Sequence, residues 1–192
     1  VNAERRAAGL PEVDSSLHLV FWGPPGTGKT TVARLLGRLY GAIGVVSKGN
    51  LVEASRPDLV AGYVGQTALK VQAMVNRARG GILFIDEAYS LAQGGDEDFG
   101  EEAIATLVKL MEDHRDDLAV IVAGYPVEMH RFVESNPGLR SRFTHDIDFP
   151  DYTVEELGAI FESIAAEAKV ELAPDLVSAL PGLGLVALIF VG

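Results

Sequence analysis

One eight-residue stretch limits the possible folds of this chain more than any other feature. Residues 23–30 read Gly-Pro-Pro-Gly-Thr-Gly-Lys-Thr, which fits the G-x-x-x-x-G-K-[ST] pattern of a phosphate-binding loop. The apolar run LHLVFW (residues 17–22) precedes the loop, and apolar side chains follow it at helical spacing: Val32, Leu35, Leu36 and Leu39. A loop between a strand and a helix directs backbone N–H groups and the positive end of the helix at an anion. The sequence therefore predicts a phosphate site at this junction.

The residue types in the loop have separate expected roles. Glycines allow the backbone to curl around phosphate oxygens. Lys29 supplies positive charge to the β- and γ-phosphates of a nucleotide, and the Thr30 hydroxyl can ligate Mg²⁺. The residues predicted to bind the nucleotide are Gly23, Pro24, Pro25, Gly26, Thr27, Gly28, Lys29, Thr30 and Thr31. The alternative is an ordinary Gly/Pro turn, which the strand before the loop and the helix after it disfavour.

Two acidic residues directly follow the apolar run ILFI (residues 82–85): Asp86 and Glu87. An acid at the end of a buried strand can hold Mg²⁺ through water, and a second acid beside it can orient and deprotonate an attacking water. We therefore predict Asp86 as a metal- and nucleotide-binding residue and Glu87 as the catalytic base. A plain helix cap would explain such a pair in isolation, and a small-molecule kinase would not need the second acid.

Apolar runs alternate with segments of helical periodicity along the chain, a pattern typical of a parallel sheet covered by helices. Strands are expected at residues 17–22, 51–54, 82–85, 118–123 and 147–149, and helices from residue 29 and at 68–79 and 101–114. Five strands, mainly parallel, with intervening helices make an α/β fold of three layers, α/β/α. We expect a linker or helix over 1–16, a core over 17–150 and a separate segment over 151–192, with an acidic amphipathic helix at 154–170.

The composition disfavours several other classes of protein. The 192 residues include 27 Asp and Glu against 16 Lys and Arg, a net charge of −11, which disfavours broad contact with nucleic acid. Since there is no cysteine, the sequence holds no disulfide, thiolate metal site or cysteine nucleophile. The longest apolar run, residues 183–191, is too short to span a membrane, and the first ten residues lack the apolar stretch of a secretory signal. We expect a cytoplasmic protein with no nucleic-acid or membrane partner.

Three longer stretches carry a more specific resemblance: LHLVFWGPPGTGKTTVARLLG, GGILFIDEAYSLAQGGDEDFGEEAIATLVKLMED and NPGLRSRF...IDFPDY. Through them, residues 17 to about 172 resemble the AAA+ ATPases, which are P-loop NTPases. Within that superfamily the chain looks most like the group of stage V sporulation protein K, the red-type rubisco activase CbbX and the type VII secretion ATPase. The resemblance implies ATP and Mg²⁺ as cofactors and a homo-oligomeric ring, usually a hexamer, with ATP bound between neighbouring subunits.

The resemblance also assigns roles to residues outside the phosphate loop. In such rings an arginine of one subunit reaches the γ-phosphate held by the next; Arg142 matches that position and Arg140 is the near alternative. A guanidinium can neutralise transition-state charge bidentately, whereas the plain alternative for this pair is a solvated surface position. Tyr125, after the apolar run 118–123, matches the sensor position of the closer group, although Asn is common there in the wider superfamily.

A further stretch resembles the central-pore loop that grips a polypeptide: Gly62, Tyr63, Val64 and Gly65. An aromatic ring offers contact area without demanding a particular client sequence, and the plain alternative is a buried Tyr in a tight turn. The acidic segment 93–100 is a candidate second pore loop or a solvated connection.

The superfamily's helical lid, which normally supplies a second sensor arginine, should follow the last strand. No Arg follows Arg142, and residues 151–192 are too few for a full lid. We therefore expect a truncated or altered lid in this segment.

The leading hypothesis is an ATP-hydrolysing protein remodeller that pulls a protein client with its pore loops. The alternatives are a DNA-handling AAA+ motor and a nucleotide-gated scaffold without turnover.

Overall fold

The computed structural model describes residues 9, 16–63, 65–94 and 99–170. A five-stranded sheet forms its centre, and every pairing between the strands is parallel. The strands are β1 (Leu19–Trp22), β2 (Leu51–Ala54), β3 (Gly81–Ile85), β4 (Leu118–Gly124) and β5 (His145–Asp148), in the spatial order β2-β3-β4-β1-β5. The predicted α/β class is confirmed, and β4 separates the strand before the phosphate loop from the strand before Asp86.

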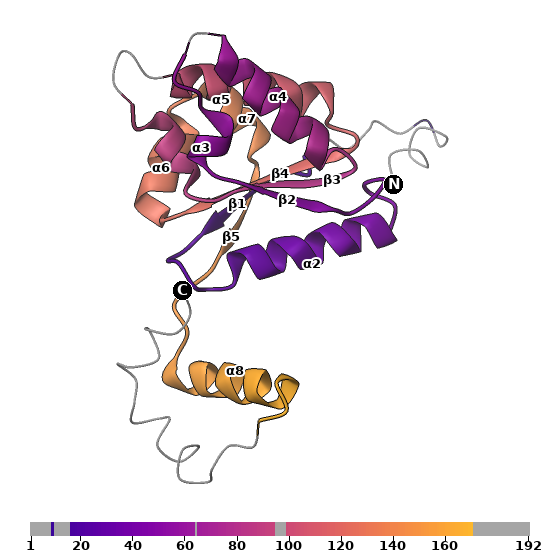
Figure 1. Cartoon of the computed structure of the whole chain (residues 1–192), viewed down its shortest axis with the longest axis vertical. Coiled ribbons are helices and arrows are strands. Elements are labelled where there is room, and N and C mark those ends of the chain that lie inside the picture. The colour runs from indigo at the N-terminus through magenta and orange to yellow at the C-terminus, as the bar shows by residue number, and fades with distance from the viewer. Residues whose placement is uncertain (1–8, 10–15, 64, 95–98, 171–192) are drawn as a thin grey trace.

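Helices cover both faces of this sheet and give it three layers (Figure 1). Helix α2 (Lys29–Ala42) packs on one face. The other face is covered by α4 (Gln66–Ala78), α5 (Gly100–Asp113), α6 (Pro126–Glu134) and α7 (Pro137–Arg142), with the short helices α3 (Arg56–Leu59) and η1 (Ala88–Ala92) at its border. Helix α8 (Val154–Glu167) stands apart from these layers (Figure 1).

The sequence of the central strand β4 is continuously apolar because helices cover both faces of the sheet. All seven of its residues are buried, because a parallel strand with helices on both sides has no face toward water. Val120 and Val122 belong to the core beneath α4 and α5, whereas Ile121 and Ala123 belong to the core beneath α2. Successive side chains of β4 therefore point to opposite faces of the sheet and contribute to a different apolar cluster on each face.

The last strand differs from its prediction at residues 147–149. The structure has β5 at His145–Asp148, with all four residues exposed, because this strand lies at the sheet edge and pairs with β1 alone. Phe149 lies beyond the strand, is buried, and packs its ring on Phe21 at a centroid distance of 4.8 Å. Its apolar character therefore reflects a contact with the core rather than membership of the strand.

The short helices α3, α6 and α7 were not predicted. The last two begin with proline in the first turn, at Pro126 and Pro137, where the missing N–H is tolerated. Fewer than ten residues give too little periodicity to distinguish such helices from loops.

No helix in the part of the chain that the structure describes is long and apolar enough to cross a membrane. Since all strands are parallel, their carboxyl-terminal ends lie along the same side of the sheet. The predicted site residues Gly23, Asp86 and Tyr125 each directly follow a strand on this side.

Candidate nucleotide-binding site

The phosphate loop adopts backbone conformations that require glycine at several positions. Gly26 and Gly28 have φ angles of 79° and 85°, in the left-handed region that side chains disfavour. A Cβ at Gly23 would come within 2.2 Å of the carbonyl oxygen of Phe149. Gly28 is also the N-cap of α2 and provides no side-chain cap, so the N–H groups of the first helical turn remain directed at the loop, where an anion is favoured.

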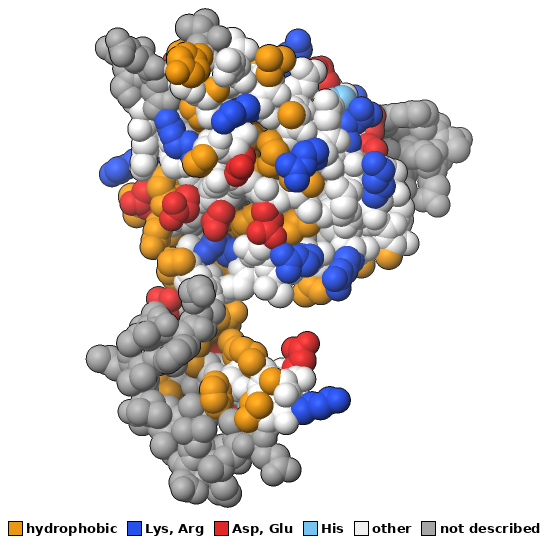
Figure 2. All heavy atoms as spheres, in the orientation of Figure 1, with side chains coloured by type: hydrophobic (Ala, Val, Ile, Leu, Met, Phe, Trp, Pro, Cys, Tyr) orange, Lys and Arg blue, Asp and Glu red, His pale blue; other side chains and the backbone are white. Residues whose placement is uncertain are grey.

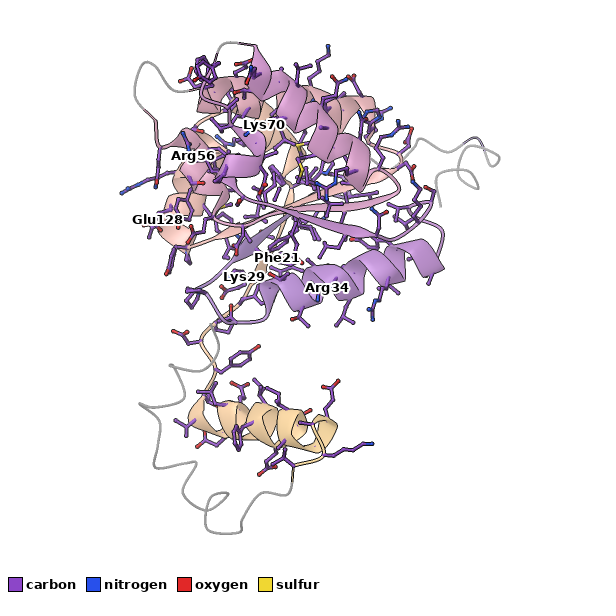
Figure 3. All side chains as sticks on the ribbon, in the orientation of Figure 1. Phe21, Lys29, Arg34, Arg56, Lys70 and Glu128 are labelled. Atoms are coloured by element: carbon purple, nitrogen blue, oxygen red, sulfur yellow. The ribbon has the colours of Figure 1, made fainter. Side chains whose placement is uncertain are left out.

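Lys29 lies at the start of α2, below β1 and Phe21 (Figure 3). It is only 7% exposed, and its ammonium group donates to loop acceptors: the carbonyl oxygens of Gly23 (3.0 Å) and Pro24 (2.5 Å), and Thr27 Oγ1 (3.5 Å). Burial lowers the pKa of Lys29, while the carboxylate of Asp86 favours the charged form and opposes this shift. Phosphate oxygens would offer the ammonium group stronger acceptors than these neutral carbonyls.

The acidic pair lies at the end of β3, and both residues are exposed. The Asp86 carboxylate accepts the backbone N–H of Glu87 at 3.0 Å. Glu87 has a φ of 47°, and a non-glycine residue in this region is a strained conformation of the kind that occurs at functional sites. The carboxylate of Asp86 favours the charged form of Lys29, so the acid after β3 acts electrostatically on the lysine of the phosphate loop.

Tyr125 follows β4 and is 41% exposed. The preceding residue, Gly124, accepts the N–H of Gly23 at 3.1 Å, so this position lies beside the start of the phosphate loop. The ring of Tyr125 is 6.4 Å from that of Tyr89. Burial raises the pKa of Tyr89, and the charge of Glu87 raises it further. Sequence analysis missed Tyr89, because only the fold shows its proximity to Tyr125.

The two arginines of α7 differ in their surroundings. The side chain of Arg140 is 71% exposed and pairs with Glu134 at 3.0 Å. The side chain of Arg142 is 22% exposed and pairs with Glu112 of α5 at 3.3 Å; it also donates to the carbonyl of Gly138 at 3.1 Å. Its buried Nε has no partner. None of these contacts of Arg140 and Arg142 involves a predicted nucleotide-binding residue.

The predicted pore loop connects α3 to α4. Tyr63 is 73% exposed, so the alternative of a buried Tyr in a tight turn is wrong. Gly65, with a φ of 76°, begins α4 as its N-cap, and Val64 lies outside the described residues. The base of the loop is held by hydrogen bonds from Lys70 Nζ to the carbonyl oxygens of Pro57 (2.8 Å) and Val60 (3.0 Å).

Three predicted nucleotide contacts lie at the loop surface or in the first turn of α2: Pro25 and Thr31 are exposed, and Thr30 is partly buried. Thr30 and Asp86 offer hydroxyl and carboxylate oxygens, the ligand types that Mg²⁺ prefers when substrate phosphates complete its coordination. The fold thus brings the phosphate loop, the acidic pair and Tyr125 to the carboxyl-terminal ends of the strands. Half of the candidate second pore loop, residues 95–98 of the segment 93–100, lies outside the described residues.

The family model described as "ATPase family associated with various cellular activities (AAA)" matches residues 19–151. The chain is 52% identical over 175 residues to stage V sporulation protein K of Bacillus subtilis (strain 168), covering 91% of this chain and 54% of that protein. It is 47% identical over 181 residues to protein CbbX of Cereibacter sphaeroides (94% of this chain, 59% of that protein). It is also 47% identical over 174 residues to the ESX-1 secretion system protein EccA1 of Mycobacterium leprae (strain TN), covering 89% of this chain and 30% of that protein.

Among solved structures, the AAA domain of FIGL-1 in complex with ADP is similar, with a TM-score of 0.61 and 20% identity over 93% of this chain and 58% of that one. This likeness supports the fold. The chain spans 59% or less of the length of the curated relatives named above.

Proposed function

The chain belongs to the AAA family of ATPases, and from this premise we propose that it binds ATP at the phosphate loop and hydrolyses it to ADP and phosphate. The observation that carries the proposal is the pairing of the loop with the acidic residues. Lys29 is buried among loop acceptors, and Asp86 acts on its charge from the end of β3. An ordinary Gly/Pro turn would not account for a buried lysine beside two exposed acids.

The chemistry of the proposed reaction assigns one task to each residue. Lys29 and the N–H groups of the loop bind the β- and γ-phosphates and stabilise the negative charge on them. Glu87 orients a water toward the γ-phosphorus and accepts its proton, as the bond from that phosphorus to the β–γ bridging oxygen breaks. The side chains of Thr30 and Asp86 would hold Mg²⁺, which neutralises charge on the phosphate oxygens when it is bound. Tyr125, beside the loop, is the proposed sensor of the γ-phosphate.

We further propose that the site is completed by a second copy of the chain in a ring. Arg142 and Arg140 are on α7 and pair with Glu112 and Glu134. An arginine that is to reach another subunit's γ-phosphate must exchange such a carboxylate for phosphate oxygens. Arg142 is the first candidate because its Nε lacks a partner, and buried unpaired polar atoms of this kind call for a functional explanation. Arg140 is the alternative because it is more exposed.

The mechanical output proposed is the remodelling of a protein client. Support comes from Tyr63, an exposed aromatic side chain between two glycines on a loop whose base is hydrogen-bonded. Stepwise movement of such loops around the oligomer would pull on a polypeptide that the aromatic side chains of the tyrosines hold.

The experiment that tests hydrolysis is a pair of substitutions in the 192-residue chain. Glu87→Gln keeps the size of the side chain but removes the base, so ATP binding should persist while turnover falls about 100-fold or more. Lys29→Ala should lose binding itself. Binding is measured by calorimetry with ATP and Mg²⁺, and turnover by phosphate release. Normal turnover by Glu87→Gln would refute the catalytic assignment.

A further inference from the structure

Tyr152 links the phosphate loop to α8. Its hydroxyl donates a hydrogen bond to the backbone carbonyl oxygen of Thr27 at 3.0 Å, across 125 residues of sequence. The next residue, Thr153, is the N-cap of α8 and forms a capping box with Glu156, with bonds of 2.8 and 3.2 Å. The residue that contacts the loop is therefore directly before the N-cap of α8.

The hydrogen bond fixes the orientation of one peptide group in the loop. In a planar trans peptide the C=O and the following N–H point in opposite directions. Because the Thr27 carbonyl points at Tyr152, the N–H of Gly28 is turned away from Tyr152. The Tyr152 hydroxyl lies so close that a Cβ at Gly28 would be 3.0 Å from it. The missing side chain at Gly28 thus serves both the positive φ angle and the approach of Tyr152.

The same loop residue is also contacted by the lysine. Thr27 is 5% exposed; its Oγ1 lies 3.5 Å from Lys29 Nζ, and it donates to the carbonyl of Pro24 at 2.9 Å. A phosphate that draws Lys29 away from Gly23 and Pro24 changes the partners of the side chain of Thr27, while Tyr152 holds its carbonyl. Thr27 is the point at which the two sets of contacts meet.

The segment before Tyr152 is anchored to the core. A movement of Tyr152 would therefore change the orientation of α8, which follows it, and not that of the anchored segment. The N–H of Phe149 donates to the carbonyl of Trp22 at 2.7 Å, and the ring of Phe149 packs on Phe21. Beyond this anchor the helix stands apart from the sheet (Figure 1), with hydrophobic side chains on its surface (Figure 2). Two exposed examples are Phe161 and Ile164.

We propose that Tyr152 is a positioning residue that couples nucleotide binding at the phosphate loop to the orientation of α8 through its hydrogen bond to the Thr27 carbonyl. The inference rests on the proposed function, since it requires that the loop bind nucleotide. The hydroxyl of Tyr152 thereby links the nucleotide-bound or free state of the phosphate loop to α8, the helix that follows the core.

The composition of the chain makes a direct test possible. Trp22, the residue before the loop, is the only tryptophan, and there is no cysteine. Glu162, an exposed residue of α8, can therefore be changed to Cys and labelled with an AEDANS acceptor for energy transfer from Trp22. Energy transfer is compared with and without a non-hydrolysable ATP analogue and Mg²⁺, in parallel with calorimetric binding, for the labelled parent, Tyr152→Phe and the control Tyr40→Phe. The control removes a phenol hydroxyl from α2 at a distance from the loop in sequence.

We expect nucleotide to change energy transfer in the parent and in Tyr40→Phe. In Tyr152→Phe the response should fall below about one quarter of the parent value while nucleotide still binds, and the melting temperature should fall by no more than about 4 °C, the effect of one lost hydrogen bond. An undiminished response in Tyr152→Phe, or a parent that binds nucleotide without any change in energy transfer, would overturn the inference. A parent that does not bind nucleotide at all would refute the proposed function as well, and calorimetry distinguishes that case.

Discussion

His18 illustrates how a single residue connects the sheet to the candidate arginine. It is 4% exposed, its Nδ1 accepts the N–H of Val120 at 3.0 Å, and its ring packs edge-on against Phe143 at 6.1 Å. Burial, with a smaller contribution from the charge of Arg142, lowers the pKa of His18 from 6.5 to about 4. The native state therefore holds this side chain neutral at pH values at which the unfolded chain protonates it.

This shift predicts a pH-dependent loss of stability. As the pH falls below 6.5 the unfolded state gains a proton that the native state gains only near pH 4, so the free energy of unfolding decreases. The expected loss is about 2 kcal/mol between pH 7 and pH 5, approaching about 3 kcal/mol below pH 4. Urea unfolding at pH 7 and pH 5 measures it.

His18→Gln is the matched variant for this prediction, because its amide oxygen can accept from Val120 but does not titrate. We expect the dependence on pH between 7 and 5 to be smaller in the variant by about 2 kcal/mol. Identical dependence in both proteins would contradict the role assigned to His18.

Candidate site residues that lie within one contiguous motif could be identified from the sequence, and residues defined by tertiary contacts could not. The loop 23–30 and the pair Asp86–Glu87 were identified because the chemistry and the spacing are local. Tyr89, Glu112 and Tyr152 were missed because their importance comes from partners in the fold; Tyr152 contacts Thr27 across 125 positions. No sequence pattern distinguishes such a tyrosine from one that merely packs on the surface.

At the scale of elements, long periodic segments and buried strands were predicted nearly to their observed bounds. The expected helix 101–114 is α5, Gly100–Asp113, and the expected buried strand 82–85 is β3, Gly81–Ile85. The edge strand β5 was misplaced because its pairing on one side leaves no apolar pattern. Its observed position depends on the register with β1, in which Leu19 is opposite His145.

The loop between α3 and α4 exposes the ring of Tyr63 to solvent. Tyr63→Ala removes the exposed ring from the proposed pore loop without touching the nucleotide site, so basal ATP turnover should remain within about twofold. Stimulation of turnover by an unfolded polypeptide, tested with casein, should be lost, because the grip depends on aromatic contact area.

Tyr63→Phe is the control for this loop, since it keeps the ring, and it should retain the stimulation. Stimulation of Tyr63→Ala equal to the parent's would contradict the pore-loop role. A parent that casein does not stimulate would count against unfolded chains as clients.

At the scale of the whole molecule, the order β2-β3-β4-β1-β5 brings the loop after β1 and the acids after β3 to one edge, with Tyr125 after β4 between them. The arginines of α7 are engaged by Glu112 and Glu134 instead. The sequence predicted the layers but not this order, because a crossover helix can lead to either neighbouring position in a sheet. The proposed ring therefore requires that two copies of the chain share each ATP site.

Mixing two variants that are each inactive tests whether subunits share the site. Glu87→Gln lacks the base but retains Arg142, whereas Arg142→Ala lacks the arginine but retains the base. Each alone should hydrolyse ATP at least about 100-fold more slowly than the parent. Arg140→Ala, mixed in the same way, tests the alternative arginine.

The measurement is phosphate release from an equimolar mixture of Glu87→Gln and Arg142→Ala at a protein concentration that gives maximal specific activity in the parent. Sites formed between a subunit with Glu87 and a neighbour with Arg142 are complete, so the mixture should recover turnover well above the sum of the two variants. A mixture no more active than that sum, both with Arg142→Ala and with Arg140→Ala, would contradict an ATP site shared between subunits.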